Sequence, residues 1–327
     1  MIGPVTRSSR ESPNAGVDDA VAPGRLSARS WGELVRRAAG HVVQARLPFL
    51  SAGVAFFAVL SVAPVLVTAL SVYGALNTPG QARSQLAGVA EVLPPQVEVL
   101  VTDQLTSITT ASAEVLTVRG LVGLGLALWT ATTAMVALID ALNVAYHETE
   151  SRGFVRRTVL GLSFVLGGAL FLGAAIALAG VTTRAIDSSP GYVRAVAAVA
   201  AWPAMAVLMC TTLAVLYRFG PDRKDPQWRW TTWGAVGATV LWAAGSVALF
   251  VYVQNLGTYG TIYGSLAGVV ISMFWLWFTV LLVVFGAAVN GESERQTTYD
   301  STTGPERPVG QRGAVVADST PHHLNRP

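Results

Sequence analysis

A run of 26 residues without a charged side chain, positions 264–289, constrains this chain more than any other feature. At a rise of 1.5 Å per residue, a helix of that length is about 39 Å long, whereas the hydrocarbon core of a bilayer is about 30 Å thick. A polar and aromatic stretch comes directly before it, at residues 252–263. The run therefore predicts a transmembrane helix.

Five further apolar runs precede this one, and each is long enough to cross a membrane as a helix. Charged residues make up only 13% of the chain, against about 25% in soluble domains. The sequence therefore predicts an all-α, polytopic membrane protein with a transmembrane domain over residues 30–290. The six predicted spans are residues 47–73, 120–146, 159–186, 193–217, 233–253 and 264–289.

The basic residues predict the orientation of these spans. Eighteen of the 22 lysines and arginines fall in the two terminal segments and in the connections after the second and the fourth span. Because loops rich in Lys and Arg stay in the cytoplasm, we expect both termini on that side. The expected location is the plasma membrane, as a multi-pass protein.

The segments outside the spans differ in pattern. Residues 1–29 and 291–327 are polar and carry scattered proline and glycine, so we expect disordered cytoplasmic tails. An amphipathic helix begins near Ser30, and it suits either an anionic membrane surface or the protein's own cytoplasmic loops. Between the first two spans, an apolar stripe in residues 97–108 predicts a helical extracytoplasmic segment.

Asp140 is the carboxylate that lies well inside a predicted span. Thr133, Asp140 and His147 are spaced by seven and would share one face of a helix. Such a carboxylate should face the bundle interior or a wet cavity, or else pair with Arg156 or Arg157. The residues predicted to line a polar cavity or substrate path are Asp140, Asn143, His147, Asn255, Tyr259, Tyr263, Ser265 and Asn290.

Pro64 lies inside the first predicted span and removes one backbone hydrogen bond there. It predicts a kink, which could serve a moving part or be a static bend.

The sequence gives no support to catalysis. The four histidines have no paired metal-ligand spacing, Cys210 is the single cysteine, and no glycine-rich phosphate loop is present. We therefore expect no cofactor and no metal. The positive-inside rule accounts for the basic loops, so we expect no nucleic-acid partner.

Four ordered motifs carry a family resemblance: SAGVAFFAVLSVAPVLV at 51–67, LIDALNVAY at 138–146, LYRFGPDRK at 216–224 and YGSLAGVVISMFWLWFTVLLVVFGAAVN at 263–290. With them the chain resembles the YihY/BrkB family of bacterial inner-membrane proteins. The resemblance implies six spans and no settled substrate. It also implies a glutamate at the position of Ala288. The ribonuclease label that the family has carried is, on these residues, a misassignment.

These observations favour a transporter-like protein of the cell envelope, one that moves a lipid or a lipid-linked molecule across the bilayer. Membrane lipids are then its expected partners. The alternative is a non-transporting scaffold for envelope assembly, which would bind envelope proteins or further copies of itself. A membrane-bound tRNA-processing ribonuclease is the remote alternative.

Overall fold

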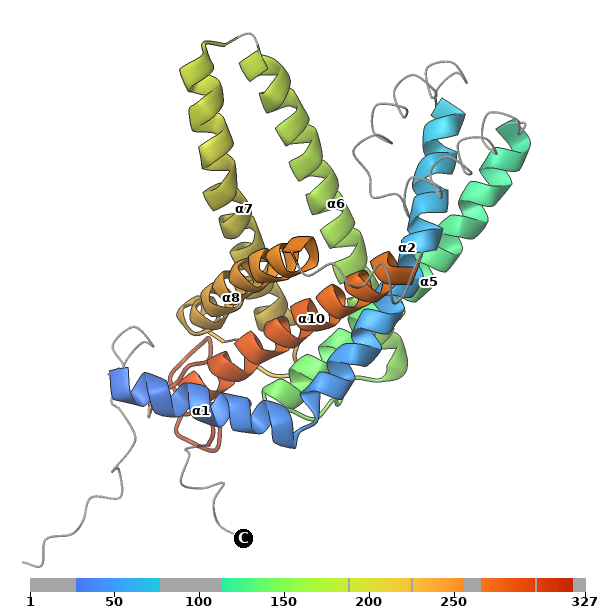
Figure 1. The fold of residues 1–327 in the computed structure, drawn as a ribbon. Helices are drawn as coiled ribbons and strands as arrows, with labels where there is room; N and C mark the ends of the chain where they lie inside the picture. The colour runs from blue at the N-terminus through green and yellow to red at the C-terminus, as the bar shows by residue number, and fades with distance from the viewer. Residues whose placement is uncertain are drawn as a thin grey trace, which may run out of the picture.

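Seven helices make up the fold in the computed structural model (Figure 1), which describes residues 28–76, 113–187, 189–224, 226–255, 266–297 and 299–319. All except the first are long and apolar enough to cross a membrane. The predicted all-α fold with six spans is therefore confirmed. The helices are α1 (Ala28–Gln44), α2 (Leu47–Leu76), α5 (Ala113–Ala145), α6 (Phe154–Asp187), α7 (Gly191–Phe219), α8 (Trp228–Asn255) and α10 (Ala267–Glu294).

The helices extend beyond the apolar runs that predicted them. Helix α5 begins at Ala113, seven residues before the predicted span, and α10 continues past the predicted end to Glu294. Hydropathy marks only the part of a helix that suits lipid, whereas backbone hydrogen bonding continues into polar sequence. The extra turn of α10 carries two glutamates into a polar region at one end of the bundle.

Helix α1 lies across that end of the bundle (Figure 1) and packs against α10 and α2. Its buried face is Leu34, Ala38 and Val42, while Arg36 is exposed. The predicted amphipathic helix is thus present, and its apolar face packs on this protein's own helices. The turn to α2 passes through Arg46, which has a left-handed backbone with φ of 54°.

Helices α2 and α5 form the most extensively packed pair of the bundle. Helix α2 runs through Pro64, and Thr68 Oγ1 donates a hydrogen bond of 2.8 Å to the Pro64 carbonyl. Gly123 of α5 faces this point, because a Cβ there would lie 2.8 Å from Thr68 Oγ1. The predicted interruption at Pro64 therefore lies at a close helix–helix contact.

Helices α8 and α10 approach each other through two glycines. A Cβ on Gly234 would lie 2.1 Å from the Gly286 carbonyl oxygen, and one on Gly286 would lie 2.7 Å from the Gly234 carbonyl oxygen. Only glycine allows backbones this close, as in other small-residue contacts between membrane helices. Helix α10 also contacts α1, α2 and α5, so it is central to the bundle.

Helices α6 and α7 diverge from α2 and α5 with distance from the end of the bundle that α1 crosses (Figure 1). Gly161 of α6 packs on α5, since a Cβ there would lie 2.8 Å from the Val136 side chain. Beyond it, residues 166–174 of α6 are exposed, and so are most described side chains of residues 191–207 in α7. We call α2 and α5 the first pair and α6 and α7 the second pair.

The segment after α10 differs from the expected disordered tail. Val316 is fully buried, Arg312 is 4% exposed, and Lys224 N–H donates a 3.0 Å hydrogen bond to the Gly313 carbonyl. Polar side chains at the ends of the helices bind this segment, although it lacks any apolar periodicity. Residues 1–27 of the predicted tail over residues 1–29, and residues 77–112 of the predicted outer segment, lie outside the described residues.

We call the loops 146–153 and 220–227 and the segment 295–319, together with the helix ends that they cover, the polar end. Among the described residues it contains no strand, only an isolated antiparallel bridge between Pro226 and Thr302.

Candidate functional site

Asp140 joins α5 to α6 close to the polar end. Its Oδ1 lies 3.0 Å and its Oδ2 3.3 Å from Nη1 of Arg157. Both side chains are partly accessible, at 39% for Asp140 and 27% for Arg157. The carboxylate therefore has the arginine partner that the sequence left open as an alternative, and the pair connects the first and second pairs of helices.

Asn143, one turn further along α5, joins two loops of the polar end. Its Nδ2 donates to Glu150 at 2.8 Å, and its Oδ1 accepts the Asp222 N–H at 2.7 Å. Ser151 donates to Asp222 through both its N–H and its hydroxyl. Arg152 bonds Glu150 through two nitrogens and lies 3.6 Å from Asp222.

These contacts shift the pKa values of the acidic side chains in the two loops. The Arg152 hydrogen bonds lower the pKa of Glu150. Burial raises the pKa of Asp222, but the Ser151 hydrogen bonds and Arg152 outweigh it, so the net shift is downward. The pKa of Glu148 shifts upward instead, because burial raises it by more than the hydrogen bond from the Val315 N–H lowers it.

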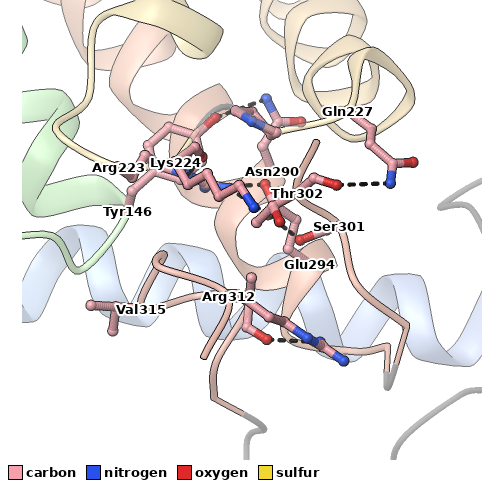
Figure 2. Close-up of polar contacts among 12 residues, drawn as sticks. Tyr146, Arg223, Lys224, Gln227, Asn290, Glu294, Ser301, Thr302, Arg312 and Val315 are labelled. Atoms are coloured by element: carbon pink, nitrogen blue, oxygen red, sulfur yellow. Dashed lines mark hydrogen bonds and ion pairs between the residues drawn. The ribbon is translucent and has the colours of Figure 1, made fainter. Parts of the chain in front are cut away.

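Asn290 is fully buried at the crossing of α10 with α8 (Figure 2). Its Oδ1 accepts the Gly234 N–H at 2.7 Å, and its Nδ2 donates to the Thr231 carbonyl at 3.0 Å and to Tyr146 Oη at 3.3 Å. One amide thus satisfies backbone groups of α8 and the phenol at the end of α5. It holds three elements together.

Arg223 and Glu294 form a fully buried ion pair beside Asn290 (Figure 2), with Arg223 Nη2 2.6 Å from Glu294 Oε2. The guanidinium lies 5.0 Å from the centre of the Tyr146 ring, and Ser301 donates to Glu294 at 2.8 Å. Burial lowers the pKa of Arg223, but Glu294 outweighs it and raises it overall. For the neutral phenol of Tyr146, burial has the opposite effect and raises the pKa.

His147 lies on a different face from Asp140, because α5 ends at Ala145 and His147 has a left-handed backbone with φ of 58°. Its ring stacks on His41 of α1 with centroids 3.8 Å apart, and its Nε2 lies 3.4 Å from Glu292. Arg37 Nε lies 3.0 Å and Arg295 Nη1 2.6 Å from Glu292. This cluster joins α1 to the end of α10.

The predicted site residues therefore divide into separate groups. Asn143 and Asn290 belong to neighbouring networks at the polar end, His147 to the cluster with α1, and Asp140 to the contact between α5 and α6. Asn255 is the last residue of α8. Tyr259, Tyr263 and Ser265 lie outside the described residues.

Sequence reasoning missed the charged residues that complete these networks. Glu292 and Glu294 follow the last apolar run directly, so hydropathy treats them as boundary residues, and the arginines that pair with them from α1 and from the loop after α7 are far away in the chain. Two glutamates just beyond a span were the available signal, since such acids need partners when the helix continues. The missed residues are Arg37, Arg223, Glu292, Glu294 and Arg312.

The sequence matches the family model described as Virulence factor BrkB over residues 38–311. The chain belongs to the BrkB family. It is 27% identical over 251 residues to the ribonuclease-like protein YfkH of Bacillus subtilis, covering 73% of this chain and 87% of the relative. No solved structure matches the chain.

Two further relatives of this chain are named UPF0761 membrane proteins. The one from Rhodospirillum centenum is 26% identical over 85% of this chain, and the one from Rhodospirillum rubrum is 27% identical over 83%. This chain spans 61% of the length of each. Their names describe membrane proteins and state no activity.

The resemblance to the BrkB family implied a glutamate at the position of Ala288. Ala288 is fully buried in α10, in the same apolar cluster as Val284 and Ala287. A glutamate among these side chains would need a buried partner. In this member of the family, α10 is apolar around position 288.

The ribonuclease name belongs to the Bacillus relative. Within the described ranges of this BrkB-family chain, no three His, Cys, Asp or Glu side chains converge as a metal site would require. The charged groups described above are paired with one another across loops and helix ends. Their arrangement closes one end of a helical bundle, and nothing in it positively indicates hydrolysis.

Proposed function

We propose that this BrkB-family protein moves a lipid or a lipid-linked molecule between the two leaflets of the plasma membrane. One observation carries the proposal: the first and second pairs of helices are joined near the polar end and diverge away from it (Figure 1). Transporters commonly work by rocking one helical group against another around a fixed contact. For an amphipathic molecule to be moved in this way, the path between the two helix pairs must be open sideways to the bilayer.

The contact between α5 and α6 has the features of a pivot for that motion. The close approach of Gly161 to Val136 and the Asp140–Arg157 pair both lie near the polar end. Beyond them, α6 exposes residues 166–174, including Leu170 at 76%. Exposed apolar side chains in a membrane face lipid, so this part of α6 is accessible to lipid.

The distribution of basic residues supports the orientation that this function needs. Most of the described lysines and arginines lie on the side of the polar end, which we therefore propose to be cytoplasmic. The divergent ends of the two pairs would then open toward the outer leaflet. A lipid would enter or leave there while the polar end stays closed.

The test uses the full chain in liposomes that contain fluorescent phospholipids. We expect the wild-type protein to bring inner-leaflet probe within reach of a membrane-impermeant quencher. Asp140→Asn and Arg157→Gln should both abolish this movement, because each breaks the contact between the pairs. Glu33→Gln is the matched control, since it removes a carboxylate that pairs with exposed Arg29 on α1.

Absence of movement by well-folded wild-type protein, beside a working positive control, would refute the proposal. The scaffold function would then be favoured by the exposed surface of α7, where Val199 and Trp202 are 71% and 76% exposed. Such a surface is covered either by lipid or by a protein partner. Cross-linking in native membranes through a cysteine placed at Val199 would reveal that partner.

A further inference from the structure

An apolar groove of about 440 Å³ lies between α1, α8 and α10. Trp31 and Val35 of α1 form one wall, and Trp233, Gly237 and Leu241 of α8 form the other. All of the lining side chains are apolar. The groove has a particular shape because Gly237 leaves open space, with nothing within 4 Å of where its Cβ would be.

The positions of two tryptophans predict that the groove runs from the level of the membrane surface into the hydrocarbon. Trp31 and Trp233 lie with ring centroids 5.8 Å apart, and tryptophan in membrane proteins favours the interface between lipid and water. From Trp233 to Leu241, α8 advances about 12 Å along its axis. This length and composition suit part of one acyl chain.

A polar pocket of about 270 Å³ begins one helical turn before the groove. Arg229 lines the pocket and Trp233 lines the groove, and residues four apart on a helix are neighbours on its surface. Asp300 and Glu306 form part of the opposite wall. The groove and the pocket thus border the same face of α8, one helical turn apart.

The charges of this pocket are of both signs and partly unpaired. Arg229 and Glu306 are exposed, and no ion pair joins either of them to another described residue. Asp300 differs, because its carboxylate already accepts hydrogen bonds from Thr302 and from the Arg307 N–H. One cation and one carboxylate therefore remain for a ligand.

We propose that the groove and the pocket together bind one phospholipid whose head group carries both a phosphate and an amine. One acyl chain lies in the groove, the phosphate lies beside Arg229, and the amine lies beside Glu306. Charge complementarity favours this zwitterion over an anionic lipid, because only the zwitterion brings a positive ammonium group to Glu306. The inference names the lipid class of the proposed function and rests on that function for its role as cargo.

The experiment uses full-length protein in vesicles that contain phosphatidylethanolamine with a diazirine in one acyl chain. A parallel set of vesicles contains phosphatidylglycerol with the same label. After irradiation, mass spectrometry locates the labelled residues. We expect labelling at residues 233–241 to be about ten-fold stronger with the ethanolamine lipid, since a charge-assisted contact changes affinity by about that factor.

Two variants and one control variant connect the labelling to the site. Gly237→Leu fills the groove with side-chain atoms and should abolish labelling there, whereas Gly125→Leu places the same side chain in open space on α5 and should leave it unchanged. Glu306→Gln changes only an exposed carboxylate and should remove the preference between the two lipids. This variant tests the head group without altering a packed position.

Equal labelling by both lipids, or labelling that Gly237→Leu does not change, would overturn the inference. Its failure is separable from failure of the proposed function. A groove that is labelled in a protein that moves no lipid would keep the binding site and remove transport. Movement of lipid with an unlabelled groove would do the reverse.

Discussion

The buried pair of Arg223 and Glu294 predicts a large and asymmetric response to mutation. Both side chains are fully buried, and Glu294 accepts hydrogen bonds from Arg223 and Ser301. Arg223→Met would leave the Glu294 carboxylate buried, with the Ser301 hydroxyl as its remaining hydrogen-bond partner. We expect this to cost about 3–5 kcal/mol of the free energy of unfolding.

The double variant Arg223→Met/Glu294→Leu should recover most of that loss, because apolar residues of similar volume often replace a buried ion pair at little cost. Thermal unfolding in detergent, followed by tryptophan fluorescence, measures both effects. The single variant should lower the midpoint by roughly 5–15 °C. Arg29→Met is the control, since the Arg29–Glu33 pair is exposed and should contribute less than about 1 kcal/mol.

The reasoning would be refuted by either of two results. A single variant as mild as Arg29→Met would show that the Arg223–Glu294 pair contributes nothing specific. A double variant that loses as much as Arg223→Met and Glu294→Leu, measured singly and added together, would show that the two residues are not coupled.

Two further predictions concern neighbouring groups at the polar end. Asn290→Ala should lower the melting temperature by an amount equivalent to about 1–3 kcal/mol, because the buried Gly234 N–H loses its acceptor; an unchanged melting temperature would contradict the assigned hydrogen bonds. Burial and the stacked His147 ring lower the pKa of His41, so the folded protein binds this proton less readily than the unfolded chain. Stability from His41 is therefore present above about pH 6.5 and is lost as the pH falls toward the folded-state pKa. Proteolysis within α1 should accelerate in mild acid, and less so in His41→Phe; equal acceleration in both would contradict this.

Sequence predicted the spans well because lipid imposes a strong and local requirement. Every stretch of about 20 apolar residues must satisfy its own backbone in hydrocarbon, and a helix does so without help from distant residues. The helix boundaries were less predictable. Helix α10 continues to Glu294 because its final turn finds Arg37, Arg223 and Arg295 as partners, and no local pattern in the sequence identifies them.

The candidate site was predictable only where helical spacing holds. Spacing by seven placed His147 beside Asp140, but α5 ends first and the left-handed backbone at His147 turns its ring toward α1. The segment after α10 was harder still. Arg312 is buried because it donates to the Tyr299 and Ala317 carbonyls and, through Nε, to the Arg307 carbonyl. Composition cannot distinguish such a satisfied arginine from a solvated one.

The packing of residues 295–319 has a consequence for biogenesis. This segment is translated after all six spans, yet it contacts Glu148, Lys224 and Gln227, which connect earlier helices. The polar end can therefore be completed only after the last helix has entered the membrane. A quality-control protease that tests nascent membrane proteins would meet these loops uncovered until then. Loss of the segment should consequently shorten the protein's lifetime in the cell even when every helix inserts correctly.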